Sequence, residues 1–268
     1  MCNGAVEPTG DAVSTRSNNG VSICIPNWNH RNFIGRSVGS ALRAAQLLKS
    51  KGLGAEVIVL DDFSRDGSQR FLFSAALHDD TKMLNVIVAS ENAGLSATRN
   101  LALSRARYNI VCFMDADNEL IPENIYHFWR SIIETNATLV YGNLVTSNGY
   151  RTAGLLSNDF VGQAIYNGNY IDAFCLVNAK RVESVGGYYV RQMTSHEDWE
   201  LLLHLIAENQ EIVFVPMALG RYYVANLSMV QTEKFDYTTM HRIFNQRKTG
   251  FPNNFRPRRI YHPDLGWL

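Results

Sequence analysis

The sequence predicts an α/β protein built on a doubly wound, mostly parallel sheet. The first observation is a set of four nearly continuous apolar runs rich in Val and Ile, at Val21–Pro26, Ala55–Leu60, Leu84–Ala89 and Asn109–Met114. Such runs are typical of parallel strands that helices cover on both faces. The second observation is that helical spacing of apolar residues follows each of the first three runs, so strand and helix alternate.

The three helices between these strands are predicted from apolar spacing and from the residues that start them. The first carries apolar residues at intervals of three or four, at Val38, Leu42, Ala45 and Leu48. The second, Phe71 to Leu77, follows the turn-forming triplet 66–68 (DGS). The third, Leu95 to Ala106, follows Gly94.

Beyond residue 120 the pattern becomes less regular. Pro122 suits the first turn of a helix whose buried face carries Ile125, Phe128, Trp129, Ile132 and Ile133. The sequence then predicts a strand at Thr138–Leu144, a helix from Ser195 to Ala207 and a strand at Ile212–Pro216. Residues 145–180 predict only short elements, and beyond about residue 230 the chain turns basic and irregular.

Composition excludes several classes of protein. The chain has 268 residues, 46% of them hydrophobic, so it can bury the core of one large domain. Its 25 Lys and Arg balance 25 Asp and Glu, so no global field recruits nucleic acid. No apolar run approaches the roughly 18 residues of a membrane span, and residues 1–19, which read as a flexible tail, do not resemble a signal peptide.

Cysteine usage predicts the compartment. The four cysteines lack the spacing of metal ligands, and Cys24 and Cys112 lie inside apolar strand patterns, where a reduced thiol behaves as a small hydrophobe. We therefore expect a cytoplasmic protein. The basic residues of 230–268 leave peripheral contact with the inner membrane face open, although a solvated basic face is the commoner outcome.

Polar clusters follow the four apolar runs. In an open parallel sheet, ligands bind beyond the carboxyl ends of the strands. There the chain carries the segments 26–29 (PNWN), 61–64 (DDFS), 91–94 (ENAG) and 115–117 (DAD). They offer an aromatic face, hydrogen-bond acceptors and a pair of carboxylates suited to Mg²⁺ or Mn²⁺. This is the inventory that a nucleoside diphosphate requires.

Five segments resemble, in this order, the family 2 glycosyltransferases with a GT-A fold: VSICIPNWN, EVIVLDDFSRDGS, ENAGLSATRNLAL, FMDADN and GGYYVRQMTSHEDWELLLHL. Ordered co-occurrence over roughly residues 20–225 is more specific than any single motif. The resemblance implies a sheet of Rossmann-like type with a smaller acceptor-side region. It divides the domain 20–229 into a nucleotide-sugar half, 20–120, and an acceptor half, 121–229, followed by the extension 230–268.

The resemblance also implies roles for individual side chains. Donor binding is implied for Pro26, Trp28, Asp62, Asn92, Arg99 and Asp115. Acceptor binding is implied for Gly187, Glu197 and Trp199. Asp117 would ligate the metal, and Asp198 would be the catalytic base.

General chemistry agrees with these implied roles. Sugar transfer leaves negative charge on the β-phosphate, which Mg²⁺ or Mn²⁺ held by Asp117 would neutralise. An acceptor hydroxyl needs a general base, for which Asp198 is the best candidate. We expect a metal-dependent glycosyltransferase that moves one sugar from a nucleotide sugar, most simply a UDP sugar, to a glycan, lipid-linked or other hydroxyl acceptor. A single in-line displacement of this kind inverts the anomeric centre.

Other interpretations stay open at this point. A sugar nucleotidyltransferase also places carboxylates at strand ends, but it needs a Gly-rich, Arg-containing loop after the first strand, which residues 26–30 do not form. A non-catalytic nucleotide- or carbohydrate-binding module on the same fold is the third candidate. Residues 195–198 (SHED) resemble a helix capping box, which competes with the base role of Asp198.

The sequence also departs from the family pattern. Asn118 stands where many relatives have a further acidic residue, and residues 220–226 contain no His, so the sequence supplies no clear second metal ligand. The signature Gln-x-x-Arg-Trp of processive synthases is missing, which favours addition of a single sugar.

Overall fold

The computed structural model describes residues 16–147, 152–157, 165, 169–190, 196–223 and 260–268. Its main strands are β1 (Ser17–Asn27), β2 (Gly54–Asp61), β3 (Leu84–Val88), β4 (Tyr108–Phe113), β5 (Glu119–Leu120), β6 (Leu139–Ser147), β7 (Thr152–Leu156), β8 (Leu176–Asn178) and β9 (Ile212–Tyr223). The helices are α1 (Ile34–Ser50), α2 (Ser68–Leu77), α3 (Leu95–Arg105), α4 (Ile125–Glu134), α5 (Ala179–Ser184) and α6 (Glu197–Ala207).

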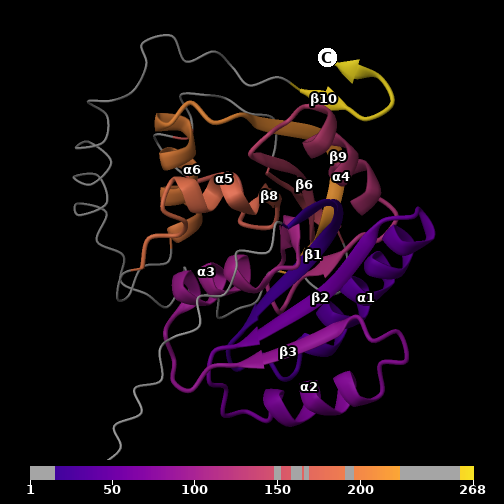
Figure 1. The fold of residues 1–268 in the computed structure, drawn as a ribbon, viewed down its shortest axis with the longest axis vertical. Coiled ribbons are helices and arrows are strands. Elements are labelled where there is room, and N and C mark those ends of the chain that lie inside the picture. Colours follow the sequence, from indigo (N-terminus) through magenta and orange to yellow (C-terminus); the bar gives the residue numbers. More distant parts are fainter. Residues whose placement is uncertain (1–15, 148–151, 158–164, 166–168, 191–195, 224–259) are drawn as a thin grey trace, which may run out of the picture.

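One sheet contains all nine of these strands, in the order β3-β2-β1-β4-β8-β6-β9-β5, with β7 paired to β6. Figure 1 shows β3, β2 and β1 side by side at one end of this order. The pairs of β1 with β2 and β4, of β2 with β3, and of β6 with β9 are parallel. The predicted doubly wound, mostly parallel sheet is therefore confirmed. β8 runs antiparallel to both neighbours, β4 and β6. As a result, the residues that precede β8 meet the residues that follow β4 at one edge of the sheet.

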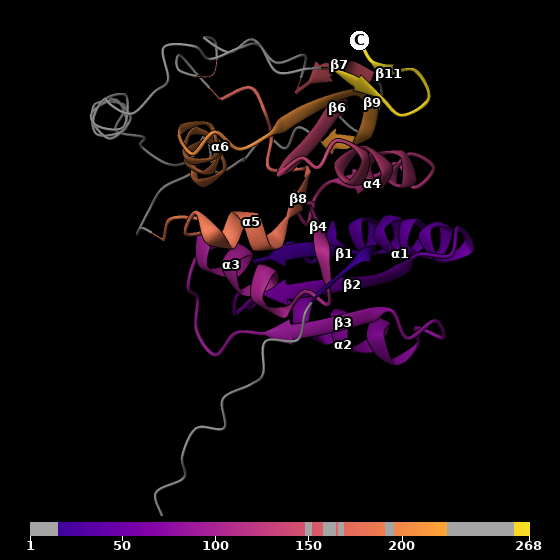
Figure 2. The same cartoon turned by 45° about the horizontal axis from the view of Figure 1, so that its top comes forward.

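The sheet is covered on both faces, as the apolar runs predict (Figure 2). On one face Val21, Ile23 and Ile25 of β1 share a core with the buried residues of α1, α2 and α4. On the other face Cys24 of β1 and Ile58 of β2 pack into a core with α3, α5 and α6. Successive residues of a strand point to opposite faces, so a buried central strand fills both cores and needs apolar side chains throughout.

Three boundaries differ from the sequence-based expectations. β9 continues to Tyr223, past the predicted end at Pro216, because it stays paired with β6 as far as Ser147. Residues 17–19, part of the predicted tail, form the start of β1, where Ser17 pairs with Tyr108 of β4. At the other end, residues 260–268 form a hairpin of β10 (Tyr261–His262) and β11 (Gly266–Trp267), where an irregular extension was expected. The hairpin docks on α4, since Arg130 donates a 2.8 Å hydrogen bond to the Pro263 carbonyl.

Three of the cysteines, Cys24, Cys112 and Cys175, are buried free thiols, as expected for small hydrophobes. Among the residues that the structure describes, every helix is too short or too polar to cross a bilayer.

Candidate active site

The exits of β1 and β2 are joined by buried side chains. Asn27 Nδ2 donates to Asp61 Oδ2 at 2.6 Å and lies 3.2 Å from Ser64 Oγ, while Asp61 Oδ1 accepts from the Ser64 amide at 2.8 Å. These bonds hold the two loops in place. Between them Trp28 is 49% exposed, whereas Pro26 is buried within the strand. Trp28 therefore supplies the aromatic surface at this exit, and contact of either residue with a nucleobase stays a prediction.

Asp62 secures the exit of β3. Its two carboxylate oxygens each accept a 2.8 Å hydrogen bond, one from the Ala93 amide and one from the Gly94 amide. Asn92 Nδ2 donates to the Asp62 carbonyl at 3.2 Å. The buried Asp62 thus fixes the 91–94 loop against the end of β2. The roles of Asp62 and Asn92 in donor binding stay predictions.

The 115–117 loop is held by α1 through its backbone. Ser37 Oγ lies 2.6 Å from the Ala116 carbonyl and 2.7 Å from that of Asn118. Arg36 Nη2 donates to the Asp117 carbonyl at 2.5 Å. Because α1 binds carbonyl oxygens, these contacts leave the carboxylates of the loop available, and the Asp115 side chain is 34% exposed.

The carboxylates of this loop repel each other. The pKa of Asp117 is raised, first by burial and then by the charge of Asp115, while His30 and Arg36 offset only part of the increase. A divalent cation would relieve this repulsion, so the donor set fits Mg²⁺ or Mn²⁺. Within the described ranges no three His, Cys, Asp or Glu side chains form a metal-holding group. Mg²⁺ is usually bound through one or two carboxylates together with substrate phosphates.

Arg99 lies in the interior, and its implied contact with the donor stays a prediction. Its side chain is 2% exposed, with Nη2 2.9 Å from Asp115 Oδ1 and Nη1 hydrogen-bonded to Glu197. Burial lowers the pKa of Arg99, but the carboxylates of Glu197 and Asp115 raise it more, so the guanidinium stays charged. Arg99 thus connects Asp115 and Glu197, which lie in two predicted segments far apart in the sequence.

Asp198 lies in the first turn of α6, close to the same cluster. It accepts hydrogen bonds from Asn169 Nδ2 at 3.0 Å and from the Trp199 amide at 2.7 Å. Burial, followed by the charges of Glu197 and Asp172, raises its pKa to about 8. The helix N-cap is His196, whose side chain makes no capping bond, and Ser195 lies outside the described residues. Asp198 therefore binds one free amide of the helix start, and its role as base stays a prediction.

The three residues implied on the acceptor side are all buried. Trp199 packs in the core and donates from Nε1 to the Ile165 carbonyl at 2.6 Å. Gly187 has φ +69°, and a Cβ there would lie 2.6 Å from Asn100 Oδ1. Glu197 binds Arg99. The structure gives each a packing or pairing partner, and direct acceptor contact stays a prediction.

Sequence reasoning missed Asp172 and Tyr222. Burial and the charge of Asp115 raise the pKa of Asp172 to about 7, and burial and the charge of Asp172 raise the pKa of Tyr222 in β9. Asp172 arrives beside Asp115 because it precedes the antiparallel strand β8. The segment 145–180 has no periodicity that predicts this strand. Residues 212–223 (IVFVPMALGRYY) do not alternate either, so no local pattern marks Tyr222.

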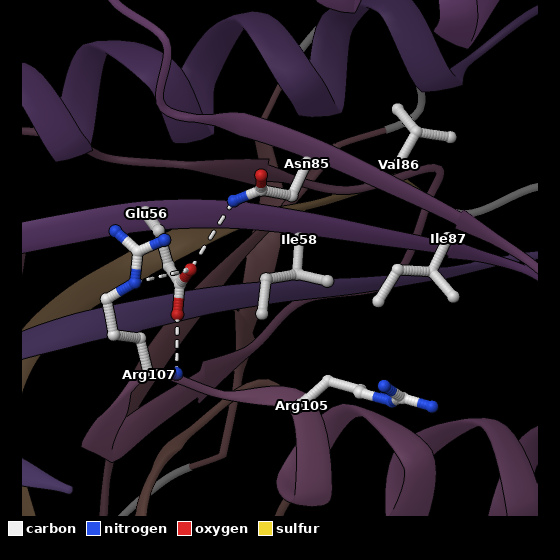
Figure 3. A pocket seen from close by; sticks show the side chains of 7 residues that line it. All are labelled: Glu56, Ile58, Asn85, Val86, Ile87, Arg105 and Arg107. Carbon is white, nitrogen blue, oxygen red and sulfur yellow. Dashed lines mark hydrogen bonds and ion pairs between the residues drawn. The ribbon is translucent and has the colours of Figure 1, made fainter. Parts of the chain in front are cut away.

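A hollow of about 320 Å³ lies elsewhere, near the starts of β2, β3 and β4 (Figure 3). It is lined by Glu56, Ile58, Asn85, Val86, Ile87, Arg105 and Arg107. Glu56 accepts from Ser22 Oγ and from the Arg107 amide, both at 2.6 Å. Its carboxylate is thus engaged in holding strands together. This hollow is at the opposite edge of the sheet from residues 115–117, so it is separate from the site.

Comparisons with known proteins identify the family of the chain. The family model "Glycosyl transferase family 2" matches residues 22–181. Glycosyltransferase GlyA of Streptococcus pneumoniae is 22% identical over 235 residues, which is 80% of this chain and 32% of that protein. The putative teichuronic acid biosynthesis glycosyltransferase TuaG of Bacillus subtilis is 32% identical over 99 residues, covering 37% of this chain and 36% of TuaG. The chain therefore spans about a third of the length of these relatives.

Solved structures show the same fold. Residues 1–349 of S. aureus TarS, in complex with UDP-GlcNAc, superpose with a TM-score of 0.69 at 16% identity, over 89% of this chain and 68% of that one. Mannosyltransferase PcManGT of Pyrobaculum calidifontis, in complex with GDP-Man and Mn²⁺, gives a TM-score of 0.60 at 14% identity, over 84% and 63% of the two chains. The fold is therefore of the GT-A type.

Proposed function

The chain belongs to glycosyl transferase family 2, and on that premise we propose that it transfers one sugar from a UDP sugar to an acceptor hydroxyl, with a divalent cation and with inversion. The observation that carries this proposal is the crowding of carboxylates at the exit of β4. Asp115, Asp117, Asp172 and Asp198 influence one another there, and Arg99 is the buried cation among them. A divalent cation bound to the donor phosphates would offset the negative charge of these carboxylates, and the hydroxyls of a neutral sugar could donate hydrogen bonds to them.

The donor would bind across the exits of β1 to β4. Trp28 lies beside two loops that hydrogen bonds hold together, and it offers a flat apolar face for a nucleobase. Asp117 would hold Mn²⁺ or Mg²⁺, and Asp115, with Oδ1 bound to Arg99, would use its other oxygen for hydroxyls of the ribose or sugar. The UDP-GlcNAc complex of the TarS fragment supports uracil as the base.

Each protein group then has a separate task. When bound, the cation would supply Lewis-acid stabilisation of the leaving diphosphate. Asp198 would accept the proton of the acceptor hydroxyl, and its raised pKa suits a base that must hold that proton during transfer. Asn169 would orient the Asp198 carboxylate through its 3.0 Å hydrogen bond. The acceptor is a hydroxyl compound, with a glycan, a lipid-linked sugar, a protein and a small molecule as its candidates.

A thermal-shift panel tests the proposal. The full chain is melted with UDP, UDP-GlcNAc, other UDP sugars and GDP-mannose, each with and without Mn²⁺. A ligand that binds only the folded state raises its stability, by about 2.7 kcal/mol at a concentration of 100 Kd. We expect a shift with UDP sugars that requires Mn²⁺. The absence of a shift with any nucleotide sugar would contradict the proposal, and pyrophosphate release from a nucleoside triphosphate would favour a nucleotidyltransferase instead.

A further inference from the structure

The buried arginine of α3 has both terminal nitrogens committed to protein carboxylates. Arg99 Nη2 binds Asp115 Oδ1 at 2.9 Å, and Nη1 binds Glu197. With 2% of its side chain exposed, the guanidinium has no surface to offer a diphosphate or a base. The planar fork of arginine fixes the direction of each bond, so the two carboxylates are held at a set separation. Arg99 therefore links the exit of β4 to the start of α6.

The link ends one residue away from the proposed base. Glu197 is as buried as the core around it, at 4% exposed, and it directly precedes Asp198 in the first turn of α6. A bond that immobilises Glu197 also sets where the Asp198 carboxylate lies. Among the described residues, Asp198 accepts hydrogen bonds from Asn169 and from the amide of Trp199. The contact of Glu197 with Arg99 ties this turn to the donor side.

The next residue of α3 strengthens the same connection. Asn100 Nδ2 donates to the Tyr188 carbonyl at 2.7 Å, and Asn100 Oδ1 accepts from the Tyr188 amide at 2.8 Å. The Arg99 guanidinium also lies 5.5 Å from the centre of the Tyr188 ring. Gly187 permits this close approach, because a Cβ there would collide with Asn100. α3 is thus docked against the acceptor-side chain at two adjacent positions.

We infer that Arg99 is a positioning residue, which holds Glu197 and Asp115 together and thereby fixes the proposed base Asp198 relative to the donor. This inference rests on the proposed function. It replaces direct donor binding, the role that the sequence resemblance implies for Arg99. A small shift of the base would be costly, since displacement of a catalytic group by about 1 Å can lower turnover about a hundredfold.

The test separates donor binding from turnover in the full chain. UDP with Mn²⁺ is the binding probe, measured by calorimetry, and turnover is UDP release from the UDP sugar that stabilises the chain most. Glu197→Gln removes the charge of the link, and Glu197→Asp keeps the charge but shortens the side chain. We expect both to lower kcat at least tenfold while the Kd for UDP changes less than threefold. Arg99→Lys, which keeps one charged bond, should retain more turnover than Arg99→Met.

Controls distinguish positioning from general weakening. Glu183→Gln breaks the exposed pair with Arg16, which is remote from the site, and should leave both measurements unchanged. Asn100→Ala removes the hydrogen bonds of α3 to Tyr188 without touching either carboxylate. It should lower the melting temperature, while kcat should stay close to the wild-type value. Each variant is melted first. If Glu197→Gln or Arg99→Met does not fold, the conservative variants Glu197→Asp and Arg99→Lys carry the test.

The outcomes are separable. If the Arg99 variants raise the Kd for UDP by the same factor as they lower kcat, Arg99 is a donor ligand and the inference is wrong. If both Glu197 variants keep full turnover, the inference is also wrong, although an active wild type leaves the proposed function intact. If the wild type binds no UDP and releases none from any UDP sugar, the proposed function fails, and the inference fails with it.

Discussion

Arg36 binds the backbone carbonyl of Asp117 at 2.5 Å. The same guanidinium lies 3.5 Å from the ring centre of Tyr223, at the end of β9. The Tyr223 hydroxyl in turn donates to Glu119 at 2.9 Å, directly beyond the 115–118 loop. The backbone that presents the predicted metal ligand is therefore braced from α1 and from β9, two elements far apart in the sequence.

Removal of the predicted metal ligand gives the most direct prediction. Asp117→Ala should lower turnover by about a thousandfold, since loss of the cation removes several kcal/mol of transition-state stabilisation. UDP release at saturating Mn²⁺ measures this, and circular dichroism checks the fold. Without Mn²⁺ the variant should melt no lower than the wild type, because its loss relieves repulsion with Asp115. Full turnover by this variant would rule out the metal role.

Tyr223 should influence cation binding through Arg36. Tyr223→Leu removes the ring beneath the guanidinium, whereas Tyr223→Phe keeps the ring and loses only the bond to Glu119. A cation–π contact contributes about 0.5–2 kcal/mol, so the Leu variant should require about 2- to 30-fold more Mn²⁺ for half-maximal turnover. The Phe variant should remain near the wild type. Equal effects of both substitutions would show that the hydroxyl, not the ring, is the important group.

Asp198→Asn should separate chemistry from binding. Loss of a general base lowers turnover about 10²- to 10⁴-fold. UDP and Mn²⁺ affinity should stay within threefold of the wild type, because Asp198 has no predicted donor contact. Calorimetry and UDP release supply the two numbers. If UDP affinity collapses together with turnover, the role of Asp198 at the start of α6 is the better explanation.

Stability should fall as pH rises through the range in which Asp198 titrates. Its pKa is about 8 in the folded chain against 3.8 in the unfolded reference, so the folded state holds the proton more tightly. The stabilisation from that proton is complete below about pH 4 and is lost as pH approaches 8. Without Mn²⁺, Asp198→Asn should therefore melt higher than the wild type, by a difference that grows from pH 5 to pH 8.

Asp66 provides the opposite control for this titration. Its pKa is lowered, since hydrogen bonds from Ser68 and the Arg31 amide outweigh the effect of burial. Its contribution is present above the unfolded pKa of 3.8 and is lost on acidification. Asp66→Asn should thus melt lower than the wild type at pH 8. A rise in melting temperature for both variants would contradict the electrostatic explanation.

Trp28 should contribute to affinity for the base. Stacking of a base on an aromatic ring is worth about 1–3 kcal/mol, so Trp28→Ala should raise the Kd for UDP by about 5- to 150-fold. Trp28→Tyr should restore most of the loss. Phe73→Ala on α2 removes a comparably exposed ring, at 53%, away from the strand exits and should leave the Kd unchanged. Equal affinities of all three variants would exclude stacking on Trp28.

The sequence predicted the elements whose signals are local. The strands at 21–26, 55–60 and 109–114 and their polar exits were recognisable, because strands buried on both faces are apolar throughout. The partner of Arg99 was not recognisable, since Glu197 lies 98 positions away. Asp172 was missed because a three-residue antiparallel strand brings it to the site, and three residues carry no period. Burial of Gly187 and Trp199 likewise depends on contacts that no local pattern records.

The covering of one sheet face by α6 has a consequence for dissecting the chain. The family model ends at residue 181, yet α6 begins at Glu197 and packs its Leu202 and Ile206 into the core that α3 shares. A fragment cut at 181 would expose that core. It would also remove Glu197, one of the two carboxylates that pair with the buried Arg99 guanidinium. The stretch that carries the family signal is therefore shorter than the cooperative unit, and excised on its own it should not hold a native state.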